Sequence, residues 1–314
     1  MQIETENVQE AGNEGIPPKR TLHYQLYLCI KALRPLQWTK NLSVFAALFF
    51  SKNLFNQNAL LKVCLAFVIF CLLSGSYYIF NDIFDRETDK EHPEKSKRPI
   101  ASGKLGIGTA IVVMVLCAFI SLTGAYFLGT PFFIVCLSSL FLQILYSLIL
   151  KKIVIVDAFA IAVAFVLRVA AGGFAINVEI SSWILICTLL LALFLALGKR
   201  RHELQLFGQG IASQRRVLAE YNGELLSHMI SIVGASTVIT YALYTVSEST
   251  REKFHTQNLI FTIPFVLYGI FRYLYLIHRK QQGGSPETIL VTDKPLYINI
   301  LLWLLTAGVI LYVK

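Results

Sequence analysis

Long apolar stretches separated by short polar ones dominate the chain. A helix that crosses a bilayer needs about 20 predominantly apolar residues. Charges, glycine and proline divide the sequence into nine stretches of this kind; the uncharged run from Leu105 to Leu150 is divided at Gly129-Thr130-Pro131. The pattern predicts an all-α integral membrane protein, a bundle of nine transmembrane helices. They lie near residues 30–51, 59–83, 107–128, 131–150, 153–175, 181–199, 225–247, 257–277 and 295–313.

The N-terminal residues lack this apolar character. Residues 1–15 are polar and acidic, without the apolar core and small-residue cleavage site of a signal peptide. Such a composition is typical of disorder. We expect a disordered cytosolic tail over residues 1–20, followed by a single transmembrane domain over residues 21–314.

The composition agrees with a membrane protein. Of the 314 residues, 55% are hydrophobic and 15% are charged, and the mean hydropathy is +0.61, whereas about a quarter of the residues in soluble domains are charged. Lysine and arginine in cytosolic loops explain the net charge of +9, and no soluble segment suggests binding to nucleic acid. The six cysteines form no Cys-x-x-Cys pair, which favours small buried hydrophobes over metal ligands or disulfides.

The distribution of lysine and arginine predicts the orientation, because cytosolic loops carry an excess of both. With the N-terminus in the cytosol, 21 of the 28 lysines and arginines fall on the cytosolic side, five on the other side and two inside spans. We therefore expect a multi-pass protein of the cell (inner) membrane. Its loops at 84–106 and 199–224 face the cytosol.

Spaced carboxylates end the second predicted span, in the sequence NDIFDRETD. At about 100° per helical residue, Tyr78, Asn81, Asp82, Asp85 and Asp89 share one face. Carboxylates crowded on one face repel one another unless a cation lies between them. Mg²⁺ prefers hard oxygen ligands and is often held by one or two carboxylates together with substrate phosphates. The spacing therefore favours a Mg²⁺ site.

The alternative is a solvated helix end whose acids pair with Lys95, Lys97 and Arg98. Ion pairs of this kind are common where acidic and basic residues follow one another in a loop. The regular N-D-x-x-D-x-x-x-D spacing at the predicted membrane surface favours the metal site over this alternative.

The same sequence, NDIFDRETD, resembles the first aspartate-rich motif of the UbiA-type intramembrane prenyltransferase superfamily. The resemblance implies nine transmembrane helices, a UbiA-like domain over residues 21–314 and a Mg²⁺-bound diphosphate substrate. Further segments look like the decaprenyl-phosphate phosphoribosyltransferase branch, which transfers ribose 5-phosphate from phosphoribosyl diphosphate to a polyprenyl phosphate. These segments are LRPLQWTKN (33–41), RPIASG (98–103), YSLILKK (146–152), FVLRVAAGG (165–173), LALGKRRHEL (195–204) and SPETILVTDKPL (285–296).

One position departs from the wider superfamily. Many members carry a second motif, Asp-x-x-x-Asp, at the cytosolic end of the sixth helix. Here that place reads Lys199-Arg200-Arg201-His202-Glu203, so only Glu203 is acidic. A phosphate-binding role therefore becomes more attractive than a second metal site. We expect Lys199, which adjoins the apolar run, to turn inward, while Arg200 and Arg201 have the alternative of anchoring the span at the cytosolic surface.

The fifth predicted span contains Asp157 and Arg168, eleven residues apart. Eleven helical steps return to within about 20°, so the two side chains are expected to face the same way. An arginine inside a span usually faces a cavity with a partner or a ligand. We favour an anion ligand over a structural ion pair with a neighbouring helix. Arg168 would lie about 20 Å from a helix start near residue 153, so this site needs a deep cavity or a later helix start.

Further cations are predicted at the same rim. Lys40 ends a basic stretch on the first predicted helix, Lys151 and Lys152 cap the fourth, and Lys199 follows the apolar run of the sixth. Cations from three helices suit a substrate with several phosphates. We expect Asn81 and Asp85 to bind Mg²⁺ and to form the catalytic centre with Asp82 and Asp89, in a central cavity that opens to the cytosol. The expected substrate-binding residues are Lys40, Tyr78, Lys151, Asp157, Arg168 and Lys199.

Two other functions fit parts of the sequence. An aromatic prenyltransferase would use a prenyl diphosphate as donor and would need few cations beyond the metal site. A transporter or flippase of a phosphorylated lipid would more often show paired internal repeats, which the sequence lacks. The surplus cations favour phosphoribosyl diphosphate, because this donor carries a second phosphate. Polyprenyl phosphate and membrane lipid are the other expected partners, and association into a homo-oligomer is left open.

Overall fold

The computed structural model describes residues 22–92, 94–208, 218, 220–279 and 286–313, and these residues form helices and no strands. The tail predicted for residues 1–20 lies outside the described residues. Eight helices are long and apolar enough to cross a membrane. They are α3 (Gln57–Phe84), α5 (Ile107–Leu128), α6 (Thr130–Leu148), α7 (Val156–Ala175), α8 (Ser182–Gly208), α9 (Gly223–Val246), α11 (Ile263–Arg279) with the turn η5 (Asn258–Thr262) before it, and α13 (Lys294–Tyr312).

These eight spans match the sequence prediction closely. Each begins and ends within three residues of its predicted bounds, except that α8 continues nine residues further, to Gly208. The agreement has a physical cause: a backbone in lipid must satisfy its own hydrogen bonds, so an apolar stretch of sufficient length becomes a helix.

The segment predicted as the first spanning helix, residues 30–51, is not one helix. It is divided into the end of α1 (Leu22–Ala32), the 3₁₀-helix η1 (Pro35–Phe45) and α2 (Ala46–Phe50). The interruption lies at Arg34, which adopts a left-handed conformation with φ 54°. The residue before a proline is disfavoured in the right-handed helical region, so Pro35 ends α1 and starts the next element.

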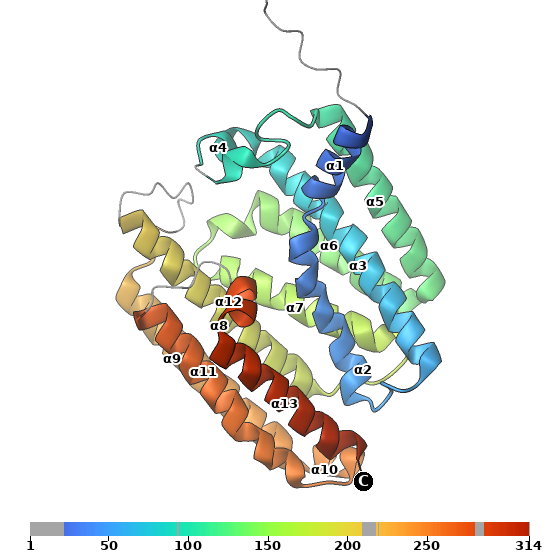
Figure 1. The fold of residues 1–314 in the computed structure, drawn as a ribbon, viewed down its shortest axis with the longest axis vertical. Helices are drawn as coiled ribbons and strands as arrows, with labels where there is room; N and C mark the ends of the chain where they lie inside the picture. The colour runs from blue at the N-terminus through green and yellow to red at the C-terminus, as the bar shows by residue number, and fades with distance from the viewer. Residues whose placement is uncertain (1–21, 93, 209–217, 219, 280–285, 314) are drawn as a thin grey trace, which may run out of the picture.

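Short elements complete the chain at the two ends of the bundle. Figure 1 shows α1 and α4 at one end, and α2, α10 and the C-terminus at the other. The remaining elements are α4 (Arg86–Lys90), η2 (Lys95–Lys97), η3 (Leu150–Lys152), α10 (Glu248–Phe254) and α12 (Pro286–Thr292).

Helix α7 lies at the centre of the packing. Its Ala158 and Ala162 belong to one buried cluster with residues of α8, α9 and α11, and its Ala171 and Ala175 belong to another with α2, α3 and α6. Small residues let membrane helices approach closely. On the outside, Val112, Val115, Phe119 and other large apolar side chains of α5 are exposed, as expected of a surface that meets lipid.

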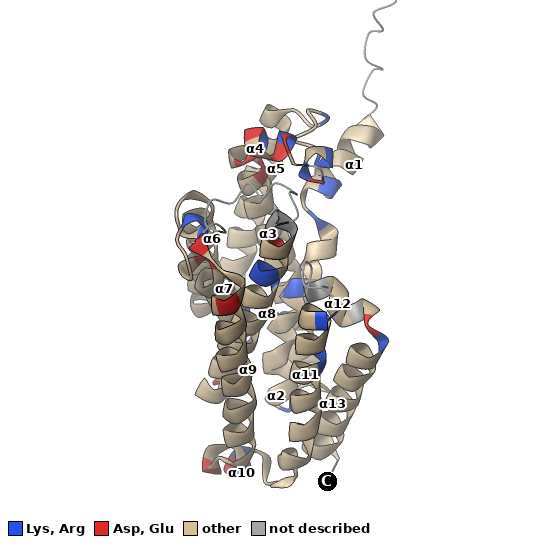
Figure 2. Ribbon diagram, turned by 90° about the vertical axis from the view of Figure 1, so that its left-hand side faces the viewer, with Lys and Arg blue, Asp and Glu red and all other residues tan. Residues whose placement is uncertain are grey.

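Charge is concentrated at one end of the bundle. Figure 2 shows Lys, Arg, Asp and Glu around α1 and α4, whereas α9, α11 and α13 are almost free of charge toward the other end. The NDIFDRETD motif lies at the charged end, where α3 meets α4.

Candidate active site

The aspartate-rich motif crosses the junction of α3 and α4. Asn81 and Asp82 belong to the last turn of α3, Asp85 ends this helix with φ −91° and ψ 9°, and Asp89 lies on α4. Backbone hydrogen bonds of 2.8 Å from Asp85 N to Asn81 O and from Asp89 N to Asp85 O continue the helical spacing across the junction. The motif side chains nevertheless form two separate groups.

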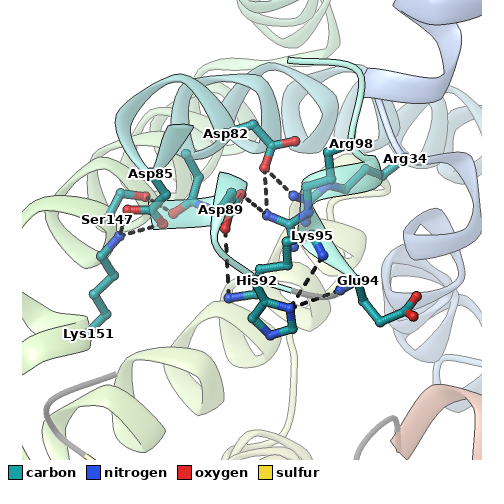
Figure 3. Close-up of polar contacts among 11 residues, drawn as sticks. Arg34, Asp82, Asp85, Asp89, His92, Glu94, Lys95, Arg98, Ser147 and Lys151 are labelled. Atoms are coloured by element: carbon teal, nitrogen blue, oxygen red, sulfur yellow. Dashed lines mark hydrogen bonds and ion pairs between the residues drawn. The ribbon is translucent and has the colours of Figure 1, made fainter. Parts of the chain in front are cut away.

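Asn81 and Asp85 face the C-terminal end of α6 and the turn that follows it. Lys151 Nζ donates to both carboxylate oxygens of Asp85, at 2.6 and 2.8 Å, and Ser147 Oγ donates to Asn81 Oδ1 at 3.2 Å (Figure 3). Lys151 also lies 5.3 Å from the ring centre of Phe84. A cation therefore already neutralises the Asp85 carboxylate, and it is the predicted Lys151.

Asp82 and Asp89 face the other way, toward arginines. Arg34 pairs with Asp82, and Arg98 Nη1 donates to Asp82 Oδ1 at 3.0 Å and to Asp89 Oδ2 at 2.5 Å (Figure 3). Lys95 Nζ lies 3.8 Å from Asp89. The ion-pair alternative thus holds for these two acids.

The second group, Asp82 and Asp89 with their arginines, is largely removed from water, and this burial shifts the pKa of Arg34. Asp82 and Asp89 are buried, and partial burial lowers the pKa of Arg34, against the attraction of Asp82. Lys97, the other predicted partner, pairs with Glu94 at 3.0 Å instead. Asn81 and Asp85, the expected metal ligands, therefore face one way, and Asp82 and Asp89, expected close by, face the other.

The oxygen donors of Asn81 and Asp85 fit a magnesium ion. An amide oxygen and a carboxylate lie one helical turn apart on one side of α3, and hard oxygen ligands are what Mg²⁺ prefers. Within the described part of the chain no group of three or more His, Cys, Asp and Glu residues could hold a metal. The pair therefore suits an ion that takes its other ligands from substrate phosphates and water.

Arg168 is buried in the middle of α7 and binds neutral groups. Its guanidinium donates at 2.8 Å to Asn41 Oδ1 on η1, to Tyr77 OH on α3 and to the Ala164 carbonyl oxygen. It lies twelve residues into α7, about 18 Å along the axis. Neither predicted role, anion ligand or structural ion pair, describes these contacts. Arg168 instead joins η1 and α3 to α7.

Asp157 lies far from Arg168 along α7, about 16 Å by the helical rise. Its carboxylate accepts from Arg200 Nε at 2.5 Å and from Tyr221 OH at 2.9 Å. The two residues lie three turns apart on α7, so a shared helix face does not bring their side chains into contact, and their expected substrate-binding roles stay predictions.

Arg200 corrects a second expectation. It is fully buried, and its Nη1 donates to Glu203 Oε2 at 2.6 Å, so it is an internal ion-pair residue and not a surface anchor. Lys199, predicted to turn inward, is half-buried. Arg200 thus lies between Asp157 and Glu203. Glu203, the one acid at the place of the second motif, is therefore already paired with a buried cation.

The other predicted residues lie nearby. Lys40 on η1 is half-buried, and so is Tyr78, whose ring centre lies 5.2 Å from the Arg34 guanidinium carbon. Sequence reasoning named Arg98 as a partner of the acids but missed the role of Arg34, although Arg34 occurs in a segment that carried the family resemblance. No sequence signal indicated the contacts of Ser147 or Tyr221, which depend on how the helices pack.

Fold and site together define a multi-pass membrane protein of the prenyltransferase type. Residues 41–290 match the UbiA prenyltransferase family, and the chain belongs to this family. It is therefore a membrane-embedded transferase.

Two of the most similar relatives carry the same name. The chain is 33% identical to the decaprenyl-phosphate phosphoribosyltransferase of Corynebacterium glutamicum, over 90% of this chain and 86% of the relative. It is 32% identical to the protein of the same name from Mycolicibacterium smegmatis, over 97% of each chain.

Solved structures support the fold. A UbiA homologue from Archaeoglobus fulgidus bound to GPP and Mg²⁺ superposes with a TM-score of 0.67 at 20% identity, covering 91% of this chain and all of the other. At this level of identity the likeness concerns the fold alone.

Proposed function

We propose that the protein transfers a 5-phosphoribosyl group from phosphoribosyl diphosphate to a polyprenyl phosphate of the decaprenyl type, with Mg²⁺ and with release of diphosphate. The observation that carries the proposal is the Asn81–Asp85 oxygen pair with Lys151 beside it. The names of the relatives, at 32–33% identity over most of the chain, favour this reaction within the family.

The site residues would divide the work as follows. Asn81 and Asp85 would hold Mg²⁺, which would supply positive charge to the leaving diphosphate. Lys151, which pairs with Asp85, would donate to a diphosphate oxygen. The acceptor phosphate is largely ionised near neutral pH, so no residue is needed to remove a proton from it.

The other predicted residues serve the second phosphate and the geometry. Lys40 and Lys199 supply cations for the 5-phosphate of the donor and the phosphate of the acceptor, and Tyr78 hydrogen-bonds the donor. Asp82 and Asp89 act through Arg34 and Arg98, by fixing the end of α3. Arg168 uses three of its five N–H donors in its present hydrogen bonds, so two remain with which it would contact an anion.

We also propose nine crossings, with the site at the cytosolic face of the inner membrane. The 3₁₀-helix η1 has 11 residues and α2 has five. At about 2.0 and 1.5 Å per residue they extend roughly 30 Å, the thickness of the hydrocarbon core. Together they would form the ninth crossing and one wall of a cavity that opens toward Asp85.

The test compares two donors. Purified protein in lipid vesicles with Mg²⁺ should transfer label from phosphoribosyl diphosphate to polyprenyl phosphate and release diphosphate in equal amount. A parallel reaction supplies a prenyl diphosphate and 4-hydroxybenzoate. Prenylated product in the second reaction without transfer in the first would contradict the proposal and favour an aromatic prenyltransferase.

The interrupted first segment is a feature that transporters share. The same vesicles therefore also report whether polyprenyl phosphate crosses the bilayer without chemical change. Movement of the lipid with no transfer would favour the transporter function instead.

A further inference from the structure

The connection between α6 and α7 contains a strained residue. Ile155 has φ 70° and ψ −45°, and Val156 N donates to Val154 O at 2.8 Å, which closes a three-residue γ-turn. This kind of γ-turn, with a positive φ, is rare and strained. A β-branched side chain makes it more so, because its Cβ crowds the backbone in this region. Such strain persists only where surrounding contacts hold it.

Tyr221 makes the contact that holds this turn. Its hydroxyl accepts from Ile155 N at 2.7 Å and donates to Asp157 Oδ1 at 2.9 Å. Burial raises the pKa of Tyr221, so the hydroxyl keeps the proton that it donates to Asp157. Tyr221 therefore bridges the backbone of the turn and the first turn of α7.

The far side of Asp157 is also fixed. Its Oδ2 accepts from Arg200 Nε, and Arg200 is held in turn by Glu203 at 2.6 Å. Asp157 therefore cannot follow Tyr221 if the latter shifts. The Tyr221 hydroxyl therefore lies between a fixed acceptor, Asp157, and a fixed donor, the backbone N–H of Ile155. These two contacts determine its position.

The same connection carries residues of the active site on its other side. Ser147 binds Asn81 at 3.2 Å, and Lys151 binds Asp85 at 2.6 and 2.8 Å. Lys151 precedes Ile155 by only four residues and belongs to η3, which ends at Lys152. The conformation of Ile155 therefore sets where Lys151 lies relative to α7.

We propose that Tyr221 is a positioning residue: by holding the Ile155 γ-turn, it places Lys151 where it can bind the diphosphate of the donor. The inference rests on the proposed function of Lys151. It does not give Tyr221 contact with the substrate. The proposal predicts that removing the Tyr221 hydroxyl weakens diphosphate binding, because this hydroxyl holds the strained backbone at Ile155.

The test measures the affinity for magnesium diphosphate by titration calorimetry, without turnover. Tyr221→Phe removes only the hydroxyl, and the affinity should fall about tenfold, the effect of one hydrogen bond that involves a strained or charged group. Adding Ile155→Gly should restore it, because glycine adopts a positive φ without strain. Tyr244→Phe is the matched control: Tyr244 is buried, and its hydroxyl has no hydrogen-bond partner among the described residues.

Unchanged affinity in Tyr221→Phe would overturn the proposal. So would a loss that Ile155→Gly leaves uncorrected, because Tyr221 would then act through Asp157 alone. Should Tyr221→Phe fail to fold, Ile155→Gly alone decides, since the proposal requires wild-type affinity when the tyrosine is present. Failure of the wild-type protein to bind magnesium diphosphate would instead count against the proposed function.

Discussion

Asp82 and Asp85 are three residues apart, and their surroundings give them different tasks. The side chain of Asp82 is 2% exposed and meets two arginines, whereas that of Asp85 is 26% exposed and meets Lys151. A buried carboxylate between two cations stabilises the structure around it. A partly exposed carboxylate with a single lysine partner is better placed to exchange that partner for a metal ion.

The first prediction concerns Asp85→Asn. The change keeps the shape and removes the charge, so Mg²⁺ and the leaving diphosphate lose an anchor. We expect the transfer rate at limiting Mg²⁺ to fall about 10²-fold, as when one electrostatic stabiliser is removed from other active sites. The thermal unfolding midpoint should change little. Retention of most of the activity would contradict the metal role.

Asp82→Asn is the matched control, with the same chemical change three residues earlier. It leaves Arg34 and Arg98 without their shared partner, and breaking a buried ion pair costs about 3 kcal/mol. The unfolding midpoint should therefore fall clearly. Equal midpoints for the two variants would mean that the division of the motif into two groups is wrong.

The second prediction concerns His92, which ends the loop after α4. Its Nδ1 accepts from the backbone N–H groups of Glu94 and Lys95, at 3.2 and 3.4 Å, and therefore needs the neutral ring. Burial and Lys95 place the pKa of His92 below its ordinary value of 6.5. Above pH 6.5 the ring is neutral in both the folded and the unfolded chain. Below pH 6.5 the unfolded chain binds the proton before the folded chain does, so folding stability decreases as the pH is lowered.

The measurement is the unfolding midpoint between pH 5 and 8 in wild type and His92→Asn. The asparagine oxygen accepts at every pH, so the variant should lose less stability on acidification. Parallel pH curves for the two proteins would show that His92 makes no contribution.

Residue partners were the part of the site that the sequence could not supply. Helical periodicity placed Asn81 and Asp85 on one face correctly, since that geometry is local. It did not show that Arg200 is buried, because this depends on its pairing with Asp157 from another helix. Hydropathy and charge indicate whether a residue prefers water, lipid or the protein interior. They do not indicate which side chain it contacts.

At the scale of elements, η1 is the least expected. Runs of 3₁₀-helix longer than three or four residues are uncommon, and this one has 11 residues. Side chains support it locally: Thr39 Oγ1 donates to Leu36 O and Ser43 Oγ to Lys40 O, each at 3.0 Å. The contact between Asn41 and Arg168 then joins it to α7. Hydropathy cannot distinguish a 3₁₀-helix from an α-helix, so the sequence predicted a continuous span.

The third prediction tests how closely η1 and α7 approach. A Cβ atom at Gly172 would lie 2.0 Å from the Val44 carbonyl oxygen, so Gly172→Ala must push the two elements apart. Overpacking of this kind costs about 2 kcal/mol, and the shift also moves Lys40 on η1. We expect a lower unfolding midpoint together with weaker binding of phosphoribosyl diphosphate.

Gly108→Ala serves as the control, because a Cβ there meets nothing within 4 Å. Alanine is a better helix former than glycine, so this variant should be at least as stable as wild type. A similar loss of stability in both variants would show that the contact with Val44 is not responsible.

At the scale of the whole molecule, lipid makes the spans predictable and leaves their packing open. Eight spans followed from hydropathy because an apolar stretch in a bilayer has no alternative to a helix. The central place of α7 did not follow, since every span is apolar and only small residues such as Ala158 and Ala171 distinguish its contacts. The orientation of the bundle in the membrane is predicted separately, from the lysines and arginines of the loops.

The fourth prediction concerns this orientation. The 21 lysines and arginines assigned to one side, against five on the other, predict that residue 103 lies in the cytosol. If η1 and α2 cross the bilayer, nine crossings separate the N-terminus from the C-terminus, and α13 ends on the outer side. If they do not, eight crossings return the chain to the side where it began.

Reporter fusions at the N-terminus and in the turn at 51–56, between α2 and α3, measure this difference directly, because η1 and α2 lie between the two sites. A phosphatase that is active only outside the cytosol should be inactive at the N-terminus and active in the turn. A fusion after residue 103 is the internal control and should be inactive. Equal activity at the N-terminus and in the turn would contradict the nine crossings. Activity after residue 103 would invert the molecule and move Asp85 out of reach of a cytosolic donor.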